Sequence, residues 1–337
     1  MNKPKVSVII VNWNGGEVFK ECLYSLSKIN YPRWELIVVD NGSFDGSQHF
    51  AKKCKLIKNA KNLGFALANN QGIKLAKGKY VLLLNNDTKV QKDFLSKLVQ
   101  RLEQNKTIGV IQPKIYLMDK KGFLDNAGSF LTRIGFFYHW GFMEKDGEEY
   151  QKEREIFSAK GACMLIRSDV IKKVGLFDDD FFAYFEESDF CWRVWLAGFK
   201  VLFYPDAKIF HKLGYTIRRL NVKELNYHYY KNRICSLIKN LSGLNLINIL
   251  IPHLIISELL SLIFLIRGQF KYSYMIQKAC FWNLWNLQNT LSKRGKIQKF
   301  RILSDRQLFR TALYPINFSR FFNDFRRVED DLERKQK

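Results

Sequence analysis

The stretch YVLLLNNDT, residues 80–88, is the part of the sequence that decides the fold class. Its first five residues are apolar or aromatic, which is typical of a strand that is buried on both faces of a sheet. Asn85, Asn86, Asp87 and Thr88 follow at once. The stretch therefore predicts a buried strand that ends in one carboxylate and two amides.

The same pattern occurs twice earlier in the chain. Apolar runs at residues 6–11 and 36–39 end in the polar stretches NWNGG (12–16) and DNGS (40–43), and residues 56–58 predict one more short strand. Residues 17–29, 47–54 and 66–76 predict helices between these strands. Such an alternation indicates a mostly parallel sheet covered on both faces, with the ligand site outside the carboxyl ends of the strands.

The three polar clusters have two interpretations. Asp, Asn and Gly after a strand are ordinary turn residues. Three clusters at the same edge of one sheet favour a ligand cleft instead. No GxGxxG motif follows the first strand, which disfavours a dinucleotide-binding fold of the usual kind.

Composition narrows the class of protein. The 337 residues, 47% of them hydrophobic, are enough for one large domain with an appendage or for two domains. Six scattered cysteines without a CxxC pair predict reduced thiols, and without a recognisable secretory leader we expect a cytosolic start. The net charge of +23 indicates a polyanionic partner, and residues 212–337 hold 23 Lys and Arg against 8 Asp and Glu.

An acidic cluster follows a predicted buried strand at 160–167 and a short helix at 169–174. The stretch FFAYFEESDFCWR, residues 181–193, places Glu186, Glu187 and Asp189 at the start of a helix that Gly198 closes. Carboxylates there can cap the helix, and Asp189 and Arg193 have the spacing of a surface ion pair. The aromatic neighbours would also desolvate the carboxylates and raise their pKa, as a general base requires. The residues alone support both interpretations.

Six stretches in chain order carry a resemblance to a known family: VSVIIVNWNG, VVDNGSFDGS, NLGFALANNQGI, LLLNNDT, the run from GACMLIRSD to RVWLAGFK, and YPDAKIFHKLG. Over roughly residues 4–215 the chain resembles the family 2 glycosyltransferases. Their fold is GT-A, an α/β fold with a Rossmann-like mixed sheet that binds nucleotide sugars. Within the family, the chain looks most like the rhamnosyltransferase-like branch of bacterial polysaccharide synthesis.

The resemblance implies transfer of a sugar from a nucleotide-diphosphate sugar, with dTDP-rhamnose favoured, to a hydroxyl of a saccharide acceptor with inversion at the anomeric carbon. In this family Asp40 would contact the nucleotide base, with Ser43 nearby, whereas a simple turn is the alternative for the loop around Gly64. The donor-binding residues that the resemblance implies are Asn12, Asp40, Ser43, Asn62, Gly64, Asn70 and Asn86.

The resemblance also implies a metal site. Residues 85–87, NND, occupy the place of the family's DxD motif, so Asp87 would bind Mg²⁺ or Mn²⁺ that holds the sugar diphosphate. Asn85 replaces the first acid, which leaves one anionic ligand and makes the nucleotide supply much of the coordination. His211 matches a histidine that approaches the metal or diphosphate, and a structural hydrogen bond is its alternative role.

Glu187 falls where relatives carry the proposed base, with Glu186 and Asp189 as competitors for that role. The implied mechanism is a single displacement, in which Glu187 takes the proton of the acceptor hydroxyl while Asp87 and the cation stabilise the leaving diphosphate.

The C-terminal third contains one long apolar segment, residues 244–266, whose only formal charge is Glu258. It can be a membrane span, a core helix of a soluble domain, or a monotopic helix on the membrane surface. A helical stripe of polar residues and nearby aromatic and basic residues favour the monotopic interpretation. The stripe consists of Asn245, Asn248, Pro252 or His253, Ser257 and Ser261. The nearby residues are Lys239, Arg267, Lys271, Tyr272, Tyr274, Phe281, Trp282, Trp285, Lys293, Arg294, Phe318, Arg320, Phe321, Phe322, Arg326 and Arg327.

These observations predict a GT-A domain at residues 1–215 and a basic, aromatic-rich helical region at 216–337 that attaches to an anionic membrane surface. We expect a peripheral or monotopic enzyme on the cytoplasmic face of the cell membrane, with an acceptor linked to polyprenyl diphosphate. Nucleic-acid binding is disfavoured because no base-reading motif is visible. A nucleotidyltransferase would want a Gly-rich phosphate loop that residues 12–16 match poorly, and Asn85 and Glu187 leave an inactive binding module open.

Overall fold

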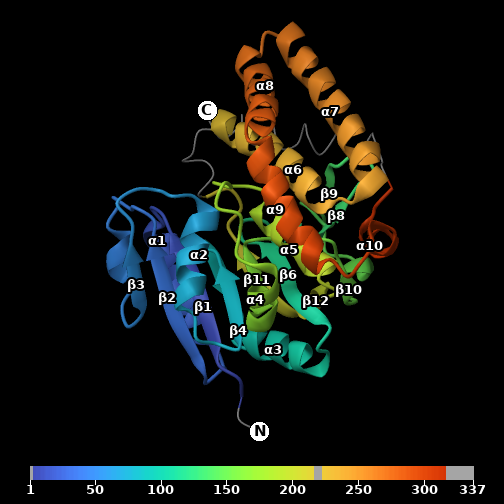
Figure 1. The fold of residues 1–337 in the computed structure, drawn as a ribbon. Coiled ribbons are helices and arrows are strands. Elements are labelled where there is room, and N and C mark those ends of the chain that lie inside the picture. The colour runs from blue at the N-terminus through green and yellow to red at the C-terminus, as the bar shows by residue number, and fades with distance from the viewer. Residues whose placement is uncertain (1–2, 216–221, 316–337) are drawn as a thin grey trace.

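The computed structural model describes residues 3–215 and 222–315. Its centre is a mixed sheet with the strand order β10-β12-β6-β11-β4-β1-β2-β3, in which β5 adds to β12 and β7 to β6, while β8 and β9 form a separate hairpin (Figure 1). The strands are β1 (Val6–Asn12), β2 (Trp34–Asp40), β3 (Lys55–Lys58), β4 (Tyr80–Leu84), β5 (Thr88–Val90), β6 (Ile108–Leu117), β7 (Leu124–Asn126), β8 (Ser129–Leu131), β9 (Phe137–His139), β10 (Arg154–Glu155), β11 (Cys163–Arg167) and β12 (Lys200–His211).

The predicted parallel half of the sheet is confirmed. Strands β3, β2, β1 and β4 lie side by side and parallel, with Asn12 in register with Asp40. The three polar clusters therefore meet at one edge of the sheet. Beyond β4 the sheet becomes mixed, because β11 pairs antiparallel with both β4 and β6.

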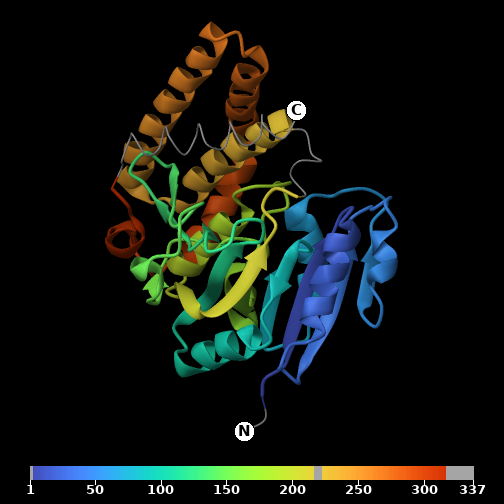
Figure 2. The ribbon, with the colours of Figure 1, turned by 180° about the vertical axis from the view of Figure 1, so that it is seen from behind.

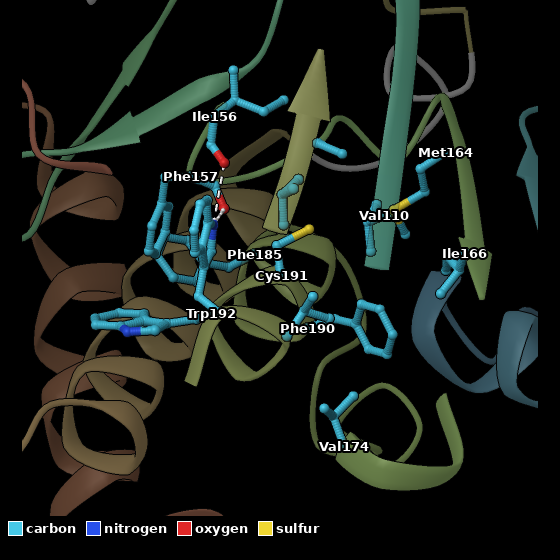
Figure 3. Close-up of a cluster of buried hydrophobic side chains, with 14 of the residues drawn as sticks. Val110, Ile156, Phe157, Met164, Ile166, Val174, Phe185, Phe190, Cys191 and Trp192 are labelled. Carbon is cyan, nitrogen blue, oxygen red and sulfur yellow. Dashed lines mark hydrogen bonds between the residues drawn. The ribbon is translucent and has the colours of Figure 1, made fainter. Parts of the chain in front are cut away.

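Two layers of helices cover the sheet, since alternate residues of each buried strand point to opposite faces. Val8 and Leu82 pack with α1 (Gly16–Leu26) and α3 (Phe94–Gln104). Ile9 and Leu83 belong to the cluster on the other face, which includes α2 (Phe65–Leu75), α4 (Ser168–Val174) and α5 (Glu186–Leu196). Figure 3 shows part of this second cluster around α5.

One predicted helix is mostly absent. Of residues 47–54, only Ser47–Phe50 forms a helix, a short 3-10 turn (η1), and a second such turn is η2 (Glu148–Tyr150). Lys53 has φ +55°, a left-handed conformation that cannot continue a right-handed helix. The chain turns there to enter β3 at Lys55.

The C-terminal helices are α6 (Val222–Asn240), α7 (Gly243–Ile266), α8 (Phe270–Trp285), α9 (Leu287–Phe300) and α10 (Asp305–Ala312). Helices α7 and α8 project from the end of the molecule where β1, β2 and β4 finish, away from the N-terminus (Figures 1 and 2). Cys235 of α6, Ile297 of α9 and Leu308 of α10 belong to the same buried cluster as α5. The hydrophobic core thus continues from one predicted domain into the other, and the linker at 216–221 lies outside the described residues.

Helix α7 turns one part of its polar stripe to the protein, namely His253, Ser257 and Ser261, whereas Asn245 is half-buried and Asn248 exposed, and most of its outward residues are aliphatic. His253 and Ser257 are fully buried and Ser261 nearly so. The outward residues are at least 40% exposed: Leu244, Ile247, Ile251, Ile255, Leu259, Leu262, Ile263, Leu265 and Ile266. Among the described residues, α7 is the one helix that by length and composition could cross a membrane.

Three of the basic residues expected to face a membrane are engaged inside the protein. Lys239 is buried and pairs with Asp178 and Asp189, and Lys293 pairs with Asp178. Arg294 donates to the carbonyl groups of residues 238 and 241. They are therefore structural cations. The expected residues Phe318, Arg320, Phe321, Phe322, Arg326 and Arg327 lie outside the described residues.

Candidate active site

Asn12 lies at the centre of a hydrogen-bond network at the strand ends that are expected to bind the donor. Its side-chain amide donates to Asp40 at 3.0 Å and to the hydroxyl groups of Ser43 and Ser47 at 3.1 and 2.9 Å. The Asn86 amide donates to its oxygen at 3.1 Å. Asn12 is fully buried, so it fixes the strand ends, while Asp40, 4% exposed, lies at their edge.

A second group of amides holds the loop before α2. The side chain of Asn41 joins Asn62 at 2.8 Å and the carbonyl oxygen of Gly64 at 3.2 Å. Gly64 has φ +86°, and a Cβ atom there would lie 2.4 Å from the carbonyl oxygen of Phe182. The loop can therefore approach the segment before α5 only because residue 64 is a glycine.

Asn70 has a different surrounding from Asn62 and Gly64. Its amide donates to the carbonyl oxygen of Phe177 and to Asp179, and its oxygen accepts from the backbone of Phe177. It is 1% exposed and ties α2 to the chain that leads into α5. The side chain thus positions the two elements around the site.

A chain of charged side chains crosses the middle of the site. Pairing of β5 with β12 puts His211 opposite Thr88, beside Asp87. The Nε2 atom of His211 lies 3.1 Å from Asp87 and its Nδ1 atom 2.9 Å from Asp125 of β7. Lys160 completes the chain with an Nζ atom 2.6 Å from the other oxygen of Asp125. The expected pair of Asp87 and His211 is therefore in contact.

Asp87, Asp125 and His211 are nearly closed off from solvent, whereas Lys160 is partly exposed, and this burial strengthens their electrostatic interaction. Burial alone would lower the pKa of His211, but the carboxylates of Asp87 and Asp125 outweigh it and raise this pKa to about 9. Lys160 and His211 hold the pKa of Asp125 well below its usual range in spite of burial. In the absence of a metal, the imidazole of His211 is therefore cationic and lies between the carboxylates of Asp87 and Asp125.

The donor set fits a divalent cation that is shared with a diphosphate. No group of three or more His, Cys, Asp or Glu side chains that could hold a metal occurs within residues 3–215 and 222–315. Asp87 could supply one ligand, and His211 a second once the cation displaces the proton from its Nε2 atom, with Asp125 orienting the imidazole from behind; phosphate oxygens would supply others. Such a set suits Mg²⁺ or Mn²⁺ bound together with a nucleotide.

A strained turn introduces the acidic cluster. Tyr184 and Phe185 both have positive φ, 64° and 74°, immediately before α5 begins at Glu186. The amide of Asn232 on α6 donates to the carbonyl groups of residues 183 and 184, at 3.0 and 2.7 Å. Consecutive left-handed residues are costly, so these two hydrogen bonds hold the start of α5 in place.

The two glutamates at the helix start, Glu186 and Glu187, are the candidates for a general base. Burial and then Glu187 raise the pKa of Glu186 well above its ordinary value, and burial raises that of Glu187. Glu186 is 6% exposed, whereas Glu187 is partly exposed and lies near Gly161 and Lys160. Of the two, Glu187 is better placed to meet a substrate.

Asp189 has a structural surrounding. It is fully buried, and its pair with Arg193 at 3.1 Å is an interior contact rather than the expected surface pair. It also accepts from Ser236, Asn240 and Lys239 of α6 at 2.9–3.0 Å. Burial opposes ionisation of Asp189, but Lys239 and Arg193 lower its pKa overall. Asp189 therefore fastens α5 to α6.

Three residues of the site were not identified from the sequence. Asp125 and Lys160 complete the charged chain, and Asn232 holds the strained turn. Asp125 stands in a strand of three residues, which is too short for a periodicity to mark it. No pattern singles out Asn232, which lies in a run of three polar residues, 231–233, within a helix of mixed composition.

Comparisons with known proteins found relatives in sequence and in fold. The chain is 27% identical over 199 residues to the low-salt glycan biosynthesis hexosyltransferase Agl10 of Haloferax volcanii, covering 56% of this chain and 61%, less than two thirds, of that protein. Among solved structures, the mannosyltransferase PcManGT from Pyrobaculum calidifontis, in complex with GDP-Man and Mn²⁺, has a TM-score of 0.52 at 16% identity, over 89% of this chain and 86% of that one. GalNAc-T7 with UDP, GalNAc and Mn²⁺ has a TM-score of 0.57 at 17% identity, over 71% and 48%.

These structural similarities support the expected α/β GT-A fold with its mixed sheet. The model of the family described as glycosyl transferase family 2 matches residues 7–175, half of the chain. The match includes the three polar strand ends and Asp87, Asp125 and Lys160. The chain therefore belongs to glycosyl transferase family 2.

Proposed function

We propose that the protein is an inverting, metal-dependent glycosyltransferase of cell-surface polysaccharide synthesis. It moves a sugar from a nucleotide-diphosphate sugar, dTDP-rhamnose in our proposal, to a hydroxyl group of a lipid-linked saccharide. The observation that carries the proposal is the convergence of the donor edge, the chain from Asp87 to Lys160 and the raised pKa of Glu187 at one end of the sheet.

In the proposed reaction, Glu187 takes the proton of the acceptor hydroxyl, whose oxygen attacks the anomeric carbon from the face opposite the diphosphate. Because burial raises its pKa, Glu187 is a better proton acceptor than an exposed carboxylate. Asp87 and His211 hold the cation, which when bound offsets the charge of the departing diphosphate. Asp125 keeps the imidazole oriented, and Lys160 keeps Asp125 charged.

The donor assignment is tested by thermal shift of the purified chain with UDP-, GDP- and dTDP-sugars in Mg²⁺ or Mn²⁺, with EDTA as control. We expect one nucleotide, dTDP, to raise Tm only with metal present. Asp87→Ala should lose this shift, whereas Glu187→Gln should keep it and lose transfer; Asp119→Ala and Glu148→Gln, at exposed positions, are the matched controls. If no nucleotide shifts Tm, the transferase proposal fails, and the protein is better described as a binding module with an inactive site.

We also propose that the outward face of α7 and α8 attaches the enzyme to the cytoplasmic face of the cell membrane. Ile251, Ile255, Leu259 and Leu262 are each between 50% and 55% exposed, which is uncommon for so many neighbouring aliphatic residues. Trp285 on α8 is 79% exposed, as suits a ring at headgroup depth. A helix at a lipid surface turns its apolar side chains outward and its polar ones inward, as α7 does with His253, Ser257 and Ser261.

This attachment is tested by co-sedimentation of the full chain with phosphatidylglycerol vesicles. The double variant Ile255→Glu, Leu259→Glu should remain in the supernatant, because two charges would enter the lipid. Tyr24→Glu, at a 66% exposed position on α1, is the control and should bind like the wild type. Equal binding of the double variant would refute the attachment through α7.

A further inference from the structure

Arg233 on α6 is a buried cation without a protein partner. Its side chain is fully buried, yet Nε, Nη1 and Nη2 all lack a hydrogen-bond partner within residues 3–215 and 222–315. Arginine does not lose its proton in proteins, and an isolated buried charge costs several kcal/mol, roughly, even after relaxation. By contrast, the buried Arg193 donates to Asp189 and to carbonyl groups, and the half-buried Arg294 donates to carbonyl groups.

Aromatic rings surround the guanidinium instead. Its central carbon lies 3.6 Å from the ring centre of Tyr229, 4.3 Å from Phe136 and 5.7 Å from Phe185. Each cation–π contact is worth about 0.5–2 kcal/mol, which offsets only part of the cost of burial. The rings also leave all five N–H donors without an acceptor, so the cage alone does not satisfy Arg233.

A second buried polar atom points to the same place. His253 of α7 packs its ring 4.6 Å from that of Phe136, and its Nδ1 atom contacts the carbonyl oxygen of Ile134 at 3.0 Å. A carbonyl only accepts, so Nδ1 carries the proton. The Nε2 atom is buried and has no partner among the described residues. Two unsatisfied groups from two helices thus lie against one ring, Phe136.

The surroundings of Phe136 say which anion would fit. On one side, Phe136 packs in a cluster with Leu260 and Phe264 of α7 and Ile276 of α8, on the inner side of the apolar hairpin. On the other side, Arg233 lies against the ring of Phe185, and Glu186 and Glu187 follow Phe185 in the chain. A ligand at Arg233 would therefore lie between apolar side chains of the helical hairpin on one side and the proposed base on the other.

We propose that Arg233 binds the phosphate of the prenyl-phosphate or prenyl-diphosphate group that carries the saccharide acceptor. This inference rests on the proposed function and names the contact that positions its acceptor. The guanidinium fork matches phosphate oxygens, and the anion neutralises a charge that the fold leaves uncompensated. Tyr229 is only partly buried, so its ring is the part of the cage that turns aside to admit the ligand.

The test is thermal shift of the full chain in detergent with farnesyl diphosphate, farnesol and inorganic pyrophosphate as probes. EDTA is present throughout, so that the metal-dependent donor site does not bind the diphosphate. We expect farnesyl diphosphate to raise Tm by about 4 °C near saturation and farnesol to leave it unchanged. No shift of the wild type by farnesyl diphosphate overturns the proposal without any variant.

Variants separate binding from a structural role. Arg233→Met should lose the farnesyl diphosphate shift, and its Tm without ligand should equal or exceed that of the wild type, because an uncompensated charge is removed. Arg233→Lys should keep part of the shift. Arg306→Met, at an exposed position of α10, is the matched control. An Arg233→Met chain that loses Tm and keeps the shift would show that the cage is only structural.

Two further arms separate this proposal from its premises. Short-chain phosphatidylglycerol that gives the same Arg233-dependent shift as farnesyl diphosphate would overturn the acceptor assignment in favour of a lipid headgroup. The metal-dependent shift by nucleotide sugars is measured on the same proteins and should survive in Arg233→Met. If the wild type lacks the nucleotide shift but keeps an Arg233-dependent diphosphate shift, the transferase proposal fails and the anion site stands.

Discussion

Two single variants, Asp189→Asn and Glu187→Gln, distinguish the residue that fastens α5 to α6 from the residue proposed as the general base. Asp189→Asn keeps the shape of the side chain but removes the charge that Lys239 and Arg193 pair with. Glu187→Gln keeps the shape of the proposed base and removes its ability to take a proton. We expect the first change to lower stability and the second to lower turnover.

The size of the stability loss follows from the contacts of Asp189. Removing one partner of a buried ion pair costs about 3–5 kcal/mol. Arg193 would still donate to two carbonyl groups, and Lys239 would still pair with Asp178, so we expect the lower limit, about 3 kcal/mol. For a chain of this length that lowers Tm by about 4 °C.

The expected effect of Glu187→Gln is the reverse. The carboxylate is disfavoured in the folded protein, because burial raises its pKa, so the neutral amide should leave Tm unchanged or slightly higher. Loss of a general base lowers kcat by about 100-fold or more. Both variants are measured by thermal unfolding and by turnover per folded molecule. An Asp189→Asn protein with wild-type Tm and no turnover, beside an active Glu187→Gln, would refute the assignment.

Three other changes test the surroundings of the site. Because burial and Glu187 raise the pKa of Glu186, ionisation of Glu186 should cost stability as pH rises above its ordinary value of 4.5, so the stability of Glu186→Gln relative to the wild type should increase between pH 4 and 7 in urea unfolding; a constant difference contradicts the shift. Asn232→Leu should lower kcat and keep donor affinity, since two hydrogen bonds to the strained turn are lost; a wild-type kcat contradicts its positioning role. Gly64→Ala should weaken the donor shift, because its Cβ atom meets a backbone oxygen at 2.4 Å, whereas Gly122→Ala, with similar φ and nothing within 4 Å, should not; equal effects would leave only backbone strain as the cause.

The parallel half of the fold was predictable from local sequence. Continuous apolar runs mark β1, β2 and β4, and since parallel strands end at one edge, the meeting of Asn12, Asp40 and Asp87 followed from the pattern. The strands beyond β4 were harder, because β11 and β12 pair with partners far away in the chain. That pairing brings His211 to Asp87 and Asp125, and no local periodicity encodes it.

The orientation of α7 shows another limit of pattern. Periodicity identified the stripe of His253, Ser257 and Ser261 but could not say whether it faces water or protein. The protein supplies hydrogen-bond partners for parts of this stripe, such as the carbonyl oxygen of Ile134 and the hydroxyl group of Ser273. Because buried polar groups need partners, the stripe faces inward and the aliphatic residues remain outside.

The C-terminal helices complete the candidate active site rather than merely carry it to a membrane. The family match ends at residue 175, before the helix that bears Glu187. That helix is fixed by α6, through Asn232 at the strained turn and through three residues that bind Asp189. Buried polar contacts of this kind are lost together when two elements separate, so α5 and α6 should move as one body. In the proposed reaction the sheet would hold the donor, and α6 would connect the proposed base directly to the apolar hairpin where a lipid-linked acceptor would arrive.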